Sequence, residues 1–193
     1  MSSSRQAKTE VRELRIIGGQ WRSRKLRFDA LPGVRPTPDR VRETLFNWLQ
    51  AWVSGSRCLD MFAGSGVLGF ESLSRGAHSV VFIDEQARVV ARLRDQAQSL
   101  EALNVEVVRS SAIQWLKQKP GLLFDIIFID PPYGKDLIAD ILQDVVAHCS
   151  SSARIYIEAE KALDEAVLPS GWAIEKSKQA ASVYFHLLHR VER

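Results

Sequence analysis

The sequence lacks the features of a membrane or secreted protein. No stretch approaches the roughly 18 unbroken apolar residues that a membrane-spanning helix needs. The polar residues 1–10 contain no apolar core of a signal peptide. Only two cysteines are present, and one of them, Cys58, lies inside an apolar run. This usage favours free buried thiols in a reducing compartment over a disulfide framework, so we expect a cytoplasmic protein with no membrane segment.

Metal-ligand spacing is lacking as well. The four histidines and two cysteines fall into none of the short spacings that zinc sites use, so we expect no metal site. The 193 residues, of which 46% are hydrophobic, contain no internal repeat and no low-complexity tract. A chain of this size and composition predicts one domain with a small appendage. We expect a monomer.

Positive charge is concentrated in the N-terminal part of the chain. Residues 1–50 hold eleven Lys and Arg and five Asp and Glu, a net charge of +6, whereas the remainder holds fifteen and eighteen, a net charge of −3. The interleaved aromatics Trp21 and Phe28 favour a nucleic-acid surface over a solvated tail. The residues that we expect to contact nucleic-acid phosphates are Arg15, Arg22, Arg24, Lys25, Arg27, Arg35 and Arg40. For Arg35 and Arg40, helix capping and a surface ion pair are the alternative.

Hydrophobic patterning predicts a basic N-terminal extension followed by an α/β domain. We expect a disordered tail over residues 1–11. An extension over 12–53 contains two short strands, 14–17 and 25–28, around Gly18-Gly19, and a helix that Thr37 caps and that runs to about Trp52. Residues 54–193 form the main domain.

Strands and helices alternate regularly in the main domain. Nearly all-apolar strands in such an alternation predict a parallel sheet that is covered on both faces. Two further segments, 172–177 and 182–189, predict an antiparallel hairpin that completes the sheet. The predicted parallel strands are 57–62, 79–83, 105–108, 124–129 and 154–158, and the predicted helices are 67–74, 86–100, 112–118 and 135–149.

A glycine-rich turn follows the first of these strands. Gly64 and Gly66 allow positive φ and a close approach to a ligand, and the helix that begins near Val67 directs free N–H groups at it. The literal pattern G-x-G-x-x-G also occurs in dinucleotide-binding enzymes. Asp60 at the strand end argues against a dinucleotide, because its carboxylate would repel the negatively charged pyrophosphate. It favours a ligand with an ammonium group, such as the methionine part of S-adenosylmethionine.

Two more strand ends contribute to the predicted cofactor site. Asp84 ends the second parallel strand, where an acid can accept both ribose hydroxyls; its alternative role is to cap the next helix. Ser111 and Ala112 follow the third strand, where an adenine edge could be read, although Ser111 is equally suited to capping a helix. Phe62 completes the predicted cofactor-binding set.

The fourth parallel strand ends in Asp130-Pro131-Pro132-Tyr133. Two prolines cannot continue a hydrogen-bonded ladder, so the strand stops where ligands bind in open parallel sheets. An Asp side chain and the Pro131 carbonyl offer two acceptors to an exocyclic amine, and Tyr133 offers a ring for stacking. An ordinary strand-ending turn is the alternative. We predict that these four residues form the catalytic motif.

Taken together, these motifs resemble the class I S-adenosylmethionine-dependent methyltransferases. The closer resemblance is to the bacterial small-subunit ribosomal RNA guanine-N2 methyltransferases of the RsmD type, and it covers roughly residues 12–190. The motifs that carry it are Ile16-Ile17-Gly18-Gly19-Gln20-Trp21-Arg22, the segment from Arg35 to Asn47, Asp60-Met61-Phe62-Ala63-Gly64-Ser65-Gly66 and Asp130-Pro131-Pro132-Tyr133. Ser111 is a departure, since related enzymes often carry a carboxylate or carboxamide there.

The resemblance implies a Rossmann-like, seven-stranded, mostly parallel sheet with an antiparallel C-terminal hairpin. It also implies methylation of one guanine of 16S rRNA within a partly assembled small ribosomal subunit. Three alternatives stay open from the residues: a DNA amino-methyltransferase, a nicotinamide-dependent oxidoreductase and a non-catalytic RNA-binding assembly factor. The short chain argues against the first, Asp130-Pro131-Pro132-Tyr133 against the second, and the presence of both Asp60 and Asp130 against the third.

Overall fold

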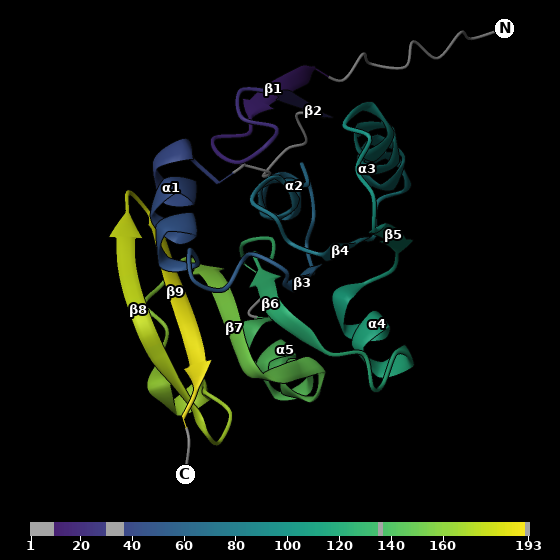
Figure 1. Cartoon of the computed structure of the whole chain (residues 1–193). Helices are drawn as coiled ribbons and strands as arrows, with labels where there is room; N and C mark the ends of the chain where they lie inside the picture. The colour runs from purple at the N-terminus through teal and green to yellow at the C-terminus, as the bar shows by residue number, and fades with distance from the viewer. Residues whose placement is uncertain (1–9, 30–36, 135–136, 192–193) are drawn as a thin grey trace, which may run out of the picture.

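A seven-stranded mixed sheet forms the centre of the protein, in the order β5-β4-β3-β6-β7-β9-β8 (Figure 1). This computed structural model describes residues 10–29, 37–134 and 137–191. The strands β3 to β7 run parallel, and β9 is antiparallel to both of its neighbours. The predicted sheet and its terminal hairpin are therefore confirmed. The strands are β3 (Arg57–Asp60), β4 (Ser79–Asp84), β5 (Val105–Arg109), β6 (Phe124–Ile129), β7 (Cys149–Ala159), β8 (Trp172–Ala180) and β9 (Val183–Arg190).

Helices cover both faces of the sheet. Figure 1 shows α1, α2 and α3 on one face and α4 and α5 on the other. Successive strand side chains point to opposite faces, so Phe128 joins the core beneath α1 to α3 while Ile127 and Ile129 join the core beneath α4 and α5. The helices are α1 (Asp39–Trp48), α2 (Val67–Ser74), α3 (Ala87–Ser99), α4 (Ala112–Gln118) and α5 (Ile138–Val145), with short 3-10 turns at Val146–His148 and Glu165–Val167.

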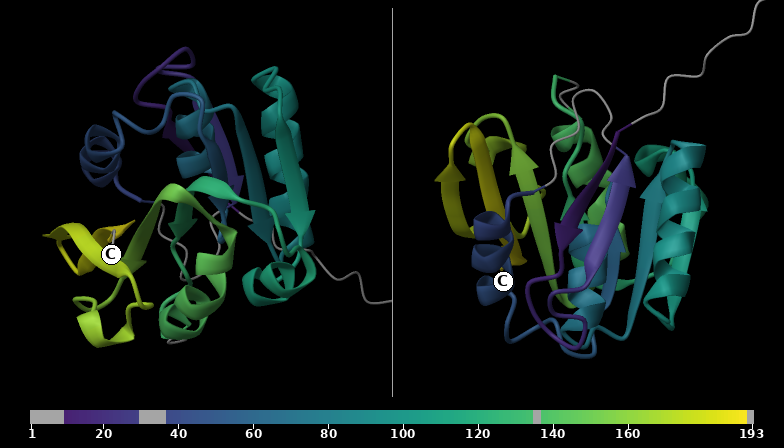
Figure 2. Two further views of the ribbon diagram at one scale, coloured as in Figure 1. Left: turned by 60° about the horizontal axis from the view of Figure 1, so that its bottom comes forward. Right: turned by 90° about the horizontal axis from the view of Figure 1, so that it is seen from above.

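The N-terminal hairpin packs on the main domain. Its strands, β1 (Val11–Arg15) and β2 (Lys25–Asp29), pair antiparallel and lie over α2, between α1 and α3, in the views of Figures 1 and 2. Ile16 and Leu26 are buried in the same core as the α1 residue Leu45. The backbone N–H of Gln20 donates to the Ser74 carbonyl at 2.7 Å. The hairpin and α1 thus share one core with the sheet.

The predicted element bounds differ from the structure at several places. Thr37 is not the helix cap: Pro38 occupies that position without a side-chain hydrogen bond, and α1 ends at Trp48 rather than near Trp52. Val11, assigned to the tail, begins β1, and residues 1–9 lie outside the described part of the chain. Cys149 was expected in a helix but starts β7, opposite Phe124. The segment 146–153 contains no Gly or Pro to mark this change.

The described residues contain no disulfide, no helix suited to span a membrane and no cluster of metal-ligating side chains. Both Cys58 and Cys149 are buried and unpaired, and burial raises the pKa of each thiol to about 12. Every helix in the described segments is too short or too polar to cross a bilayer. Within those same segments, no three His, Cys, Asp or Glu side chains are grouped so that they could hold a metal ion.

Candidate active site

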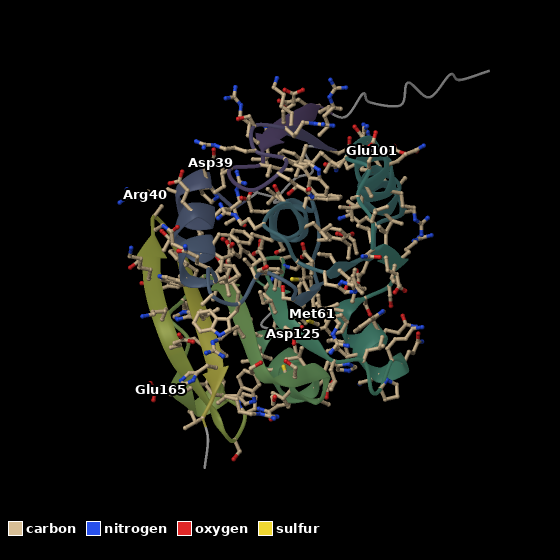
Figure 3. The ribbon with its side chains drawn as sticks, in the orientation of Figure 1. Asp39, Arg40, Met61, Glu101, Asp125 and Glu165 are labelled. Atoms are coloured by element: carbon tan, nitrogen blue, oxygen red, sulfur yellow. The ribbon has the colours of Figure 1, made fainter. Side chains whose placement is uncertain are left out.

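A cavity of about 530 Å³ opens at the carboxyl ends of β3, β4 and β6. Met61, which lines it, is labelled near the centre of the molecule in Figure 3. The crossover connections of a parallel sheet leave room for ligands at this edge. The sequence-predicted residues that the cavity brings together are Asp60, Phe62, Gly64, Asp84, Ala112, Asp130, Pro131, Pro132 and Tyr133.

Asp60 is a buried acid beneath the glycine loop, with 4% of its surface exposed. Its Oδ2 accepts a hydrogen bond from the Gly69 N–H at 3.3 Å, near the start of α2. Burial raises the pKa of Asp60 to about 7, and the negative charge of Asp84 adds to the rise. A bound cationic group would favour the ionised form of this carboxyl. The position therefore suits a ligand that carries an ammonium group.

Asp84 fixes the shape of the cavity at the end of β4. Its Oδ2 accepts from the Gly64 N–H at 3.1 Å, and its Oδ1 accepts from the Gln86 N–H at 2.9 Å. The carboxylate thus joins the glycine loop to the start of α3, and burial raises its pKa. Each carboxylate oxygen has a second acceptor site, so both helix capping and the acceptance of ribose hydroxyls are compatible with this geometry.

The glycines of the G-x-G-x-x-G turn have different roles. Gly64 (φ +49°) lines the cavity, and a Cβ there would meet nothing closer than the Phe62 carbonyl oxygen at 3.8 Å. Gly66 (φ +73°) is not among the lining residues, and a Cβ on it would collide with Leu93 and Phe70. Gly64 therefore provides access to a ligand, whereas Gly66 allows α2 to start against its neighbours.

Ser111 is committed to the start of α4. Its Oγ accepts from the Gln114 N–H at 3.2 Å, which caps the helix. The neighbours Ser110 and Ala112 line the cavity, and Ser111 does not. The wall at this point is thus formed by the residues on either side of the predicted one.

Asp130 follows directly after β6 and is partly buried. Burial raises the pKa of Asp130 well above its usual range, and the carboxylates of Glu158 and Asp60 raise it further. No described residue donates a hydrogen bond to its carboxylate. The next residue, Pro131, is buried, whereas Tyr133 is 44% exposed. The motif thus presents an acceptor and an aromatic ring at the cavity wall.

Three residues behind this motif were not predicted as part of the site. Glu158 is the penultimate residue of β7 and is 3% exposed. Its Oε1 accepts hydrogen bonds from the hydroxyl of Thr37 at 2.7 Å and from that of Tyr156 at 2.9 Å. The available signal was an acid near a strand end: Glu158 closes the strand predicted over 154–158, and Asp60 and Asp84 close β3 and β4.

The end of the N-terminal hairpin also reaches the cavity. Phe28 and Asp29 of β2 line it together with Arg92 of α3. The buried carboxylate of Asp29 pairs with Arg88 at 2.5 Å and with Arg92 at 3.3 Å. Sequence reasoning assigned this hairpin to RNA alone, because its contact with a helix sixty residues further on leaves no local pattern.

A second, smaller cavity lies on the other side of the Asp130-Pro131-Pro132-Tyr133 motif. Its volume is about 260 Å³, and its walls include Pro131 to Gly134 and the segment 158–164. The Gly134 N–H donates to the Glu160 carboxylate at 3.1 Å. The motif therefore forms a wall that the two cavities share.

The predicted RNA-contacting residues that the structure describes are all exposed. Arg15, Arg22 and Arg40 form no ion pair with any described residue, and Arg40 is labelled beside α1 in Figure 3. Lys25 and Arg27 both pair with Glu13, at 2.7 and 3.4 Å. The remaining two differ: Arg24 donates to the Ser99 carbonyl at the end of α3, and Arg35 lies outside the described residues.

Comparisons with known proteins agree with this architecture. The family model described as "Conserved hypothetical protein 95" matches residues 14–189. The ribosomal RNA small subunit methyltransferase D of Escherichia coli is 42% identical over 92% of this chain and 90% of its own length. The protein of the same name from Haemophilus influenzae is 40% identical over 91% and 93%.

Solved structures show the same fold. A candidate methyltransferase of Escherichia coli superposes with a TM-score of 0.84 and 39% identity, over 94% of this chain and all of that one. A 16S rRNA N2 methyltransferase of Thermus thermophilus, solved with AdoMet and guanosine, has a TM-score of 0.70 and 21% identity, over 95% of this chain and 50% of that one. The second likeness concerns the fold alone. By the family model and by its curated relatives, the chain belongs to the family of the ribosomal RNA small subunit methyltransferases D, the RsmD type.

Proposed function

We propose that the protein transfers a methyl group from S-adenosylmethionine to the exocyclic N2 amine of a guanine in 16S rRNA. The observation that carries the proposal is the position of Asp130. Its carboxylate lines the same cavity as Asp60 and Asp84 and accepts no hydrogen bond from any described residue. It is therefore available to an amine that enters from outside. Membership of the RsmD family supports ribosomal RNA of the small subunit as the substrate.

The cavity fits the proposed cofactor in both chemistry and size. Asp60 suits the ammonium group, Asp84 suits the ribose hydroxyls, and the backbone at Ala112 together with Phe62 suits the adenine. The volume of about 530 Å³ lies within the range of small-molecule sites. When bound, S-adenosylmethionine supplies an electrophilic methyl group, so the protein has mainly to orient the nucleophile.

The residues of the Asp130-Pro131-Pro132-Tyr133 motif would perform that orientation. The amine of guanine is a poor nucleophile because its lone pair is delocalised into the ring. Acceptors at Asp130 and at the Pro131 carbonyl would hold its two N–H groups and stabilise positive charge that develops on nitrogen. The exposed ring of Tyr133 offers a stacking surface for the flipped-out base, which contributes about 1–3 kcal/mol.

The exposed basic residues of the hairpin and of α1 would bind the RNA backbone. Arg15, Arg22 and Arg40 are the most available, since the described residues offer them no ion pair. We further propose that the substrate is 16S rRNA inside an assembling small ribosomal subunit. We also propose that the enzyme is monomeric and cytoplasmic. The net charge of +6 over residues 1–50 supports a polyanionic partner.

Methyl transfer from labelled S-adenosylmethionine tests the proposal directly. The substrates are naked 16S rRNA, small subunits stripped of this modification, and DNA, with mapping of the labelled nucleotide. The proposal requires label on N2 of one guanine in rRNA or in subunits. Label in DNA would identify a DNA amino-methyltransferase, and binding of RNA without transfer would identify an assembly factor.

A further inference from the structure

We propose that Glu158 is a positioning residue for methyl transfer, which acts through Asp130 and is itself held in place by Thr37 and Tyr156. The inference rests on the proposed function, because it assigns a role to Asp130 in the reaction. It concerns a carboxylate that does not line the main cavity and that would not touch the substrate.

The register of the sheet places the two carboxylates side by side. Ile129, the last residue of β6, pairs with Ile157 of β7, so Asp130 just after β6 and Glu158 of β7 are the next residues in the same register. Alternation along a strand directs both side chains to the face opposite that of Ile129 and Ile157. That face is the one covered by α1 to α3, where Tyr156 is also buried. The two acids therefore face the same volume from neighbouring strands.

Two hydrogen bonds fix the position of the Glu158 carboxyl group. Two hydroxyl groups, from Thr37 and from Tyr156, donate to the same oxygen, Oε1. Hydrogen bonds of this kind favour the ionised carboxylate, and they lower the pKa of Glu158 against the larger raising effect of burial. Thr37 lies just before α1 and also lines the main cavity. Thr37 of the N-terminal extension thus helps to position the carboxyl group behind the catalytic motif.

Several other groups act on Asp130 besides Glu158. Asp60 faces it from β3 and, like Glu158, raises its pKa. Tyr156 of β7 is neutral at physiological pH, because burial and the nearby Glu158 raise its pKa well above the usual value. Tyr133 follows Asp130 in the same motif. The described residues supply no cation to this group of acids, so no positive charge offsets the effect of Glu158 and Asp60 on Asp130.

This arrangement gives the proton of the reacting amine a defined destination. The amine nitrogen forms a bond to the methyl carbon as the carbon–sulfur bond breaks, and the electron pair of that bond stays on sulfur. The nitrogen then loses one proton to the carboxylate of Asp130. When Glu158 is ionised, its charge makes Asp130 a stronger proton acceptor than an isolated aspartate. Solvent regenerates the carboxylate after the methylated base has left.

The pH dependence of turnover separates this role from a merely structural one. Glu158→Gln keeps the shape and the acceptor oxygen but removes the charge. We expect the acid limb of the kcat profile to move down by about one pH unit and the plateau to fall about tenfold, with little change in the KM for RNA. Glu158→Asp should return the acid limb toward the wild-type position. Glu165→Gln, on an exposed 3-10 turn (Figure 3), is the charge-matched control and should change neither.

A carbon-13 titration of the Asp130 carboxyl in the unliganded protein provides a readout without turnover. Its midpoint should fall by about one pH unit in Glu158→Gln and should stay unchanged in Glu165→Gln. An unchanged midpoint in Glu158→Gln, or a loss of turnover with no movement of the acid limb, would overturn the inference. If wild-type protein methylates no rRNA, the proposed function fails, and the titration still decides whether the two carboxyls are paired.

Discussion

Arg42 and Glu71 form a completely buried ion pair, in which Nη1 and Oε2 are 3.5 Å apart. Arg42 also donates to the Arg15 carbonyl at 2.9 Å, and Glu71 accepts from the Ile17 N–H at 2.8 Å. Arg75 pairs with the second oxygen of Glu71. The pair therefore joins the hairpin, α1 and α2 at one point, directly behind the helix that follows the glycine loop.

Removal of Glu71 should destabilise the whole protein. Glu71→Ala removes the buried charge partner of Arg42, which keeps only the exposed Asp39, and leaves the Ile17 N–H without its acceptor. We expect the free energy of unfolding to fall by about 3 kcal/mol, the lower end of the cost of breaking a buried ion pair. Urea unfolding measures this change. Glu43→Ala, at an exposed position of α1, should stay within about 0.5 kcal/mol of wild type. Equal effects for the two variants would contradict the role of the pair.

Alanine variants of two glycines with the same backbone conformation should distinguish the cost of backbone strain from the cost of overpacking. Gly55 and Gly66 have φ angles of +75° and +73°, but only at Gly66 would a Cβ meet neighbouring atoms. Alanine at either position costs about 1–2 kcal/mol because of the left-handed conformation. Gly66→Ala should cost about 1–3 kcal/mol more, because it overpacks the contact with Leu93 and Phe70. Thermal or urea unfolding of both variants compares them, and equal losses would show that packing at Gly66 is not tight.

Affinity for S-adenosylmethionine should depend on the ionisation of Asp60. Burial raises the pKa of this carboxyl to about 7, so the unliganded protein holds a proton there at lower pH. A ligand that needs the carboxylate must displace that proton, and its affinity should fall up to about tenfold per pH unit as the pH drops below about 7.

Calorimetric titrations between about pH 6 and about pH 8 measure this dependence. Asp60→Asn should bind more weakly and should lose the part of the slope that comes from Asp60. Parallel slopes in the two proteins would refute the assignment. The contribution of Asp60 to folding stability changes with pH in the opposite direction to the cofactor affinity. Because the pKa of Asp60 is raised in the folded state, its protonated form stabilises the fold at low pH, and this contribution is lost as the pH rises through about 7.

The salt dependence of RNA binding should distinguish two groups of basic residues. Replacement of Arg15, Arg22 and Arg40 by alanine should lower the salt slope by about 0.7–0.9 for each phosphate contact that is lost. Replacement of Lys25 and Arg27 should have a smaller effect per residue, since both already pair with Glu13. Fluorescence anisotropy over a series of salt concentrations measures both slopes. An unchanged slope in the triple variant would assign those residues to solubility instead.

The sequence predicted those parts of the site that depend on local pattern. Apolar runs that end in Asp60, Asp84 and Asp130 indicated three strand ends, and a parallel sheet brings such ends to one edge. The G-x-G-x-x-G turn predicted the start of α2. These inferences needed only periodicity and the inability of proline to continue a ladder.

Contacts between distant segments could not be predicted in the same way. The Thr37 hydroxyl reaches Glu158, 121 residues further along the chain, and local reasoning assigned Thr37 to a helix cap instead. Arg42 lies within the apolar stripe of α1 between Val41 and Leu45. A charged residue inside such a stripe was a usable sign of a buried ion pair, although its partner Glu71 could be identified only in the fold.

The most direct test of the account is a paired measurement on Asp130→Ala. If Asp130 orients the amine and accepts its proton, kcat for rRNA methylation should fall by about 100- to 1,000-fold, while the affinity for S-adenosylmethionine changes by less than about threefold. Asp125→Asn, at the opposite end of the same strand (Figure 3), should retain wild-type turnover. Retained turnover in Asp130→Ala, or an equal loss of turnover and of cofactor affinity, would contradict the account.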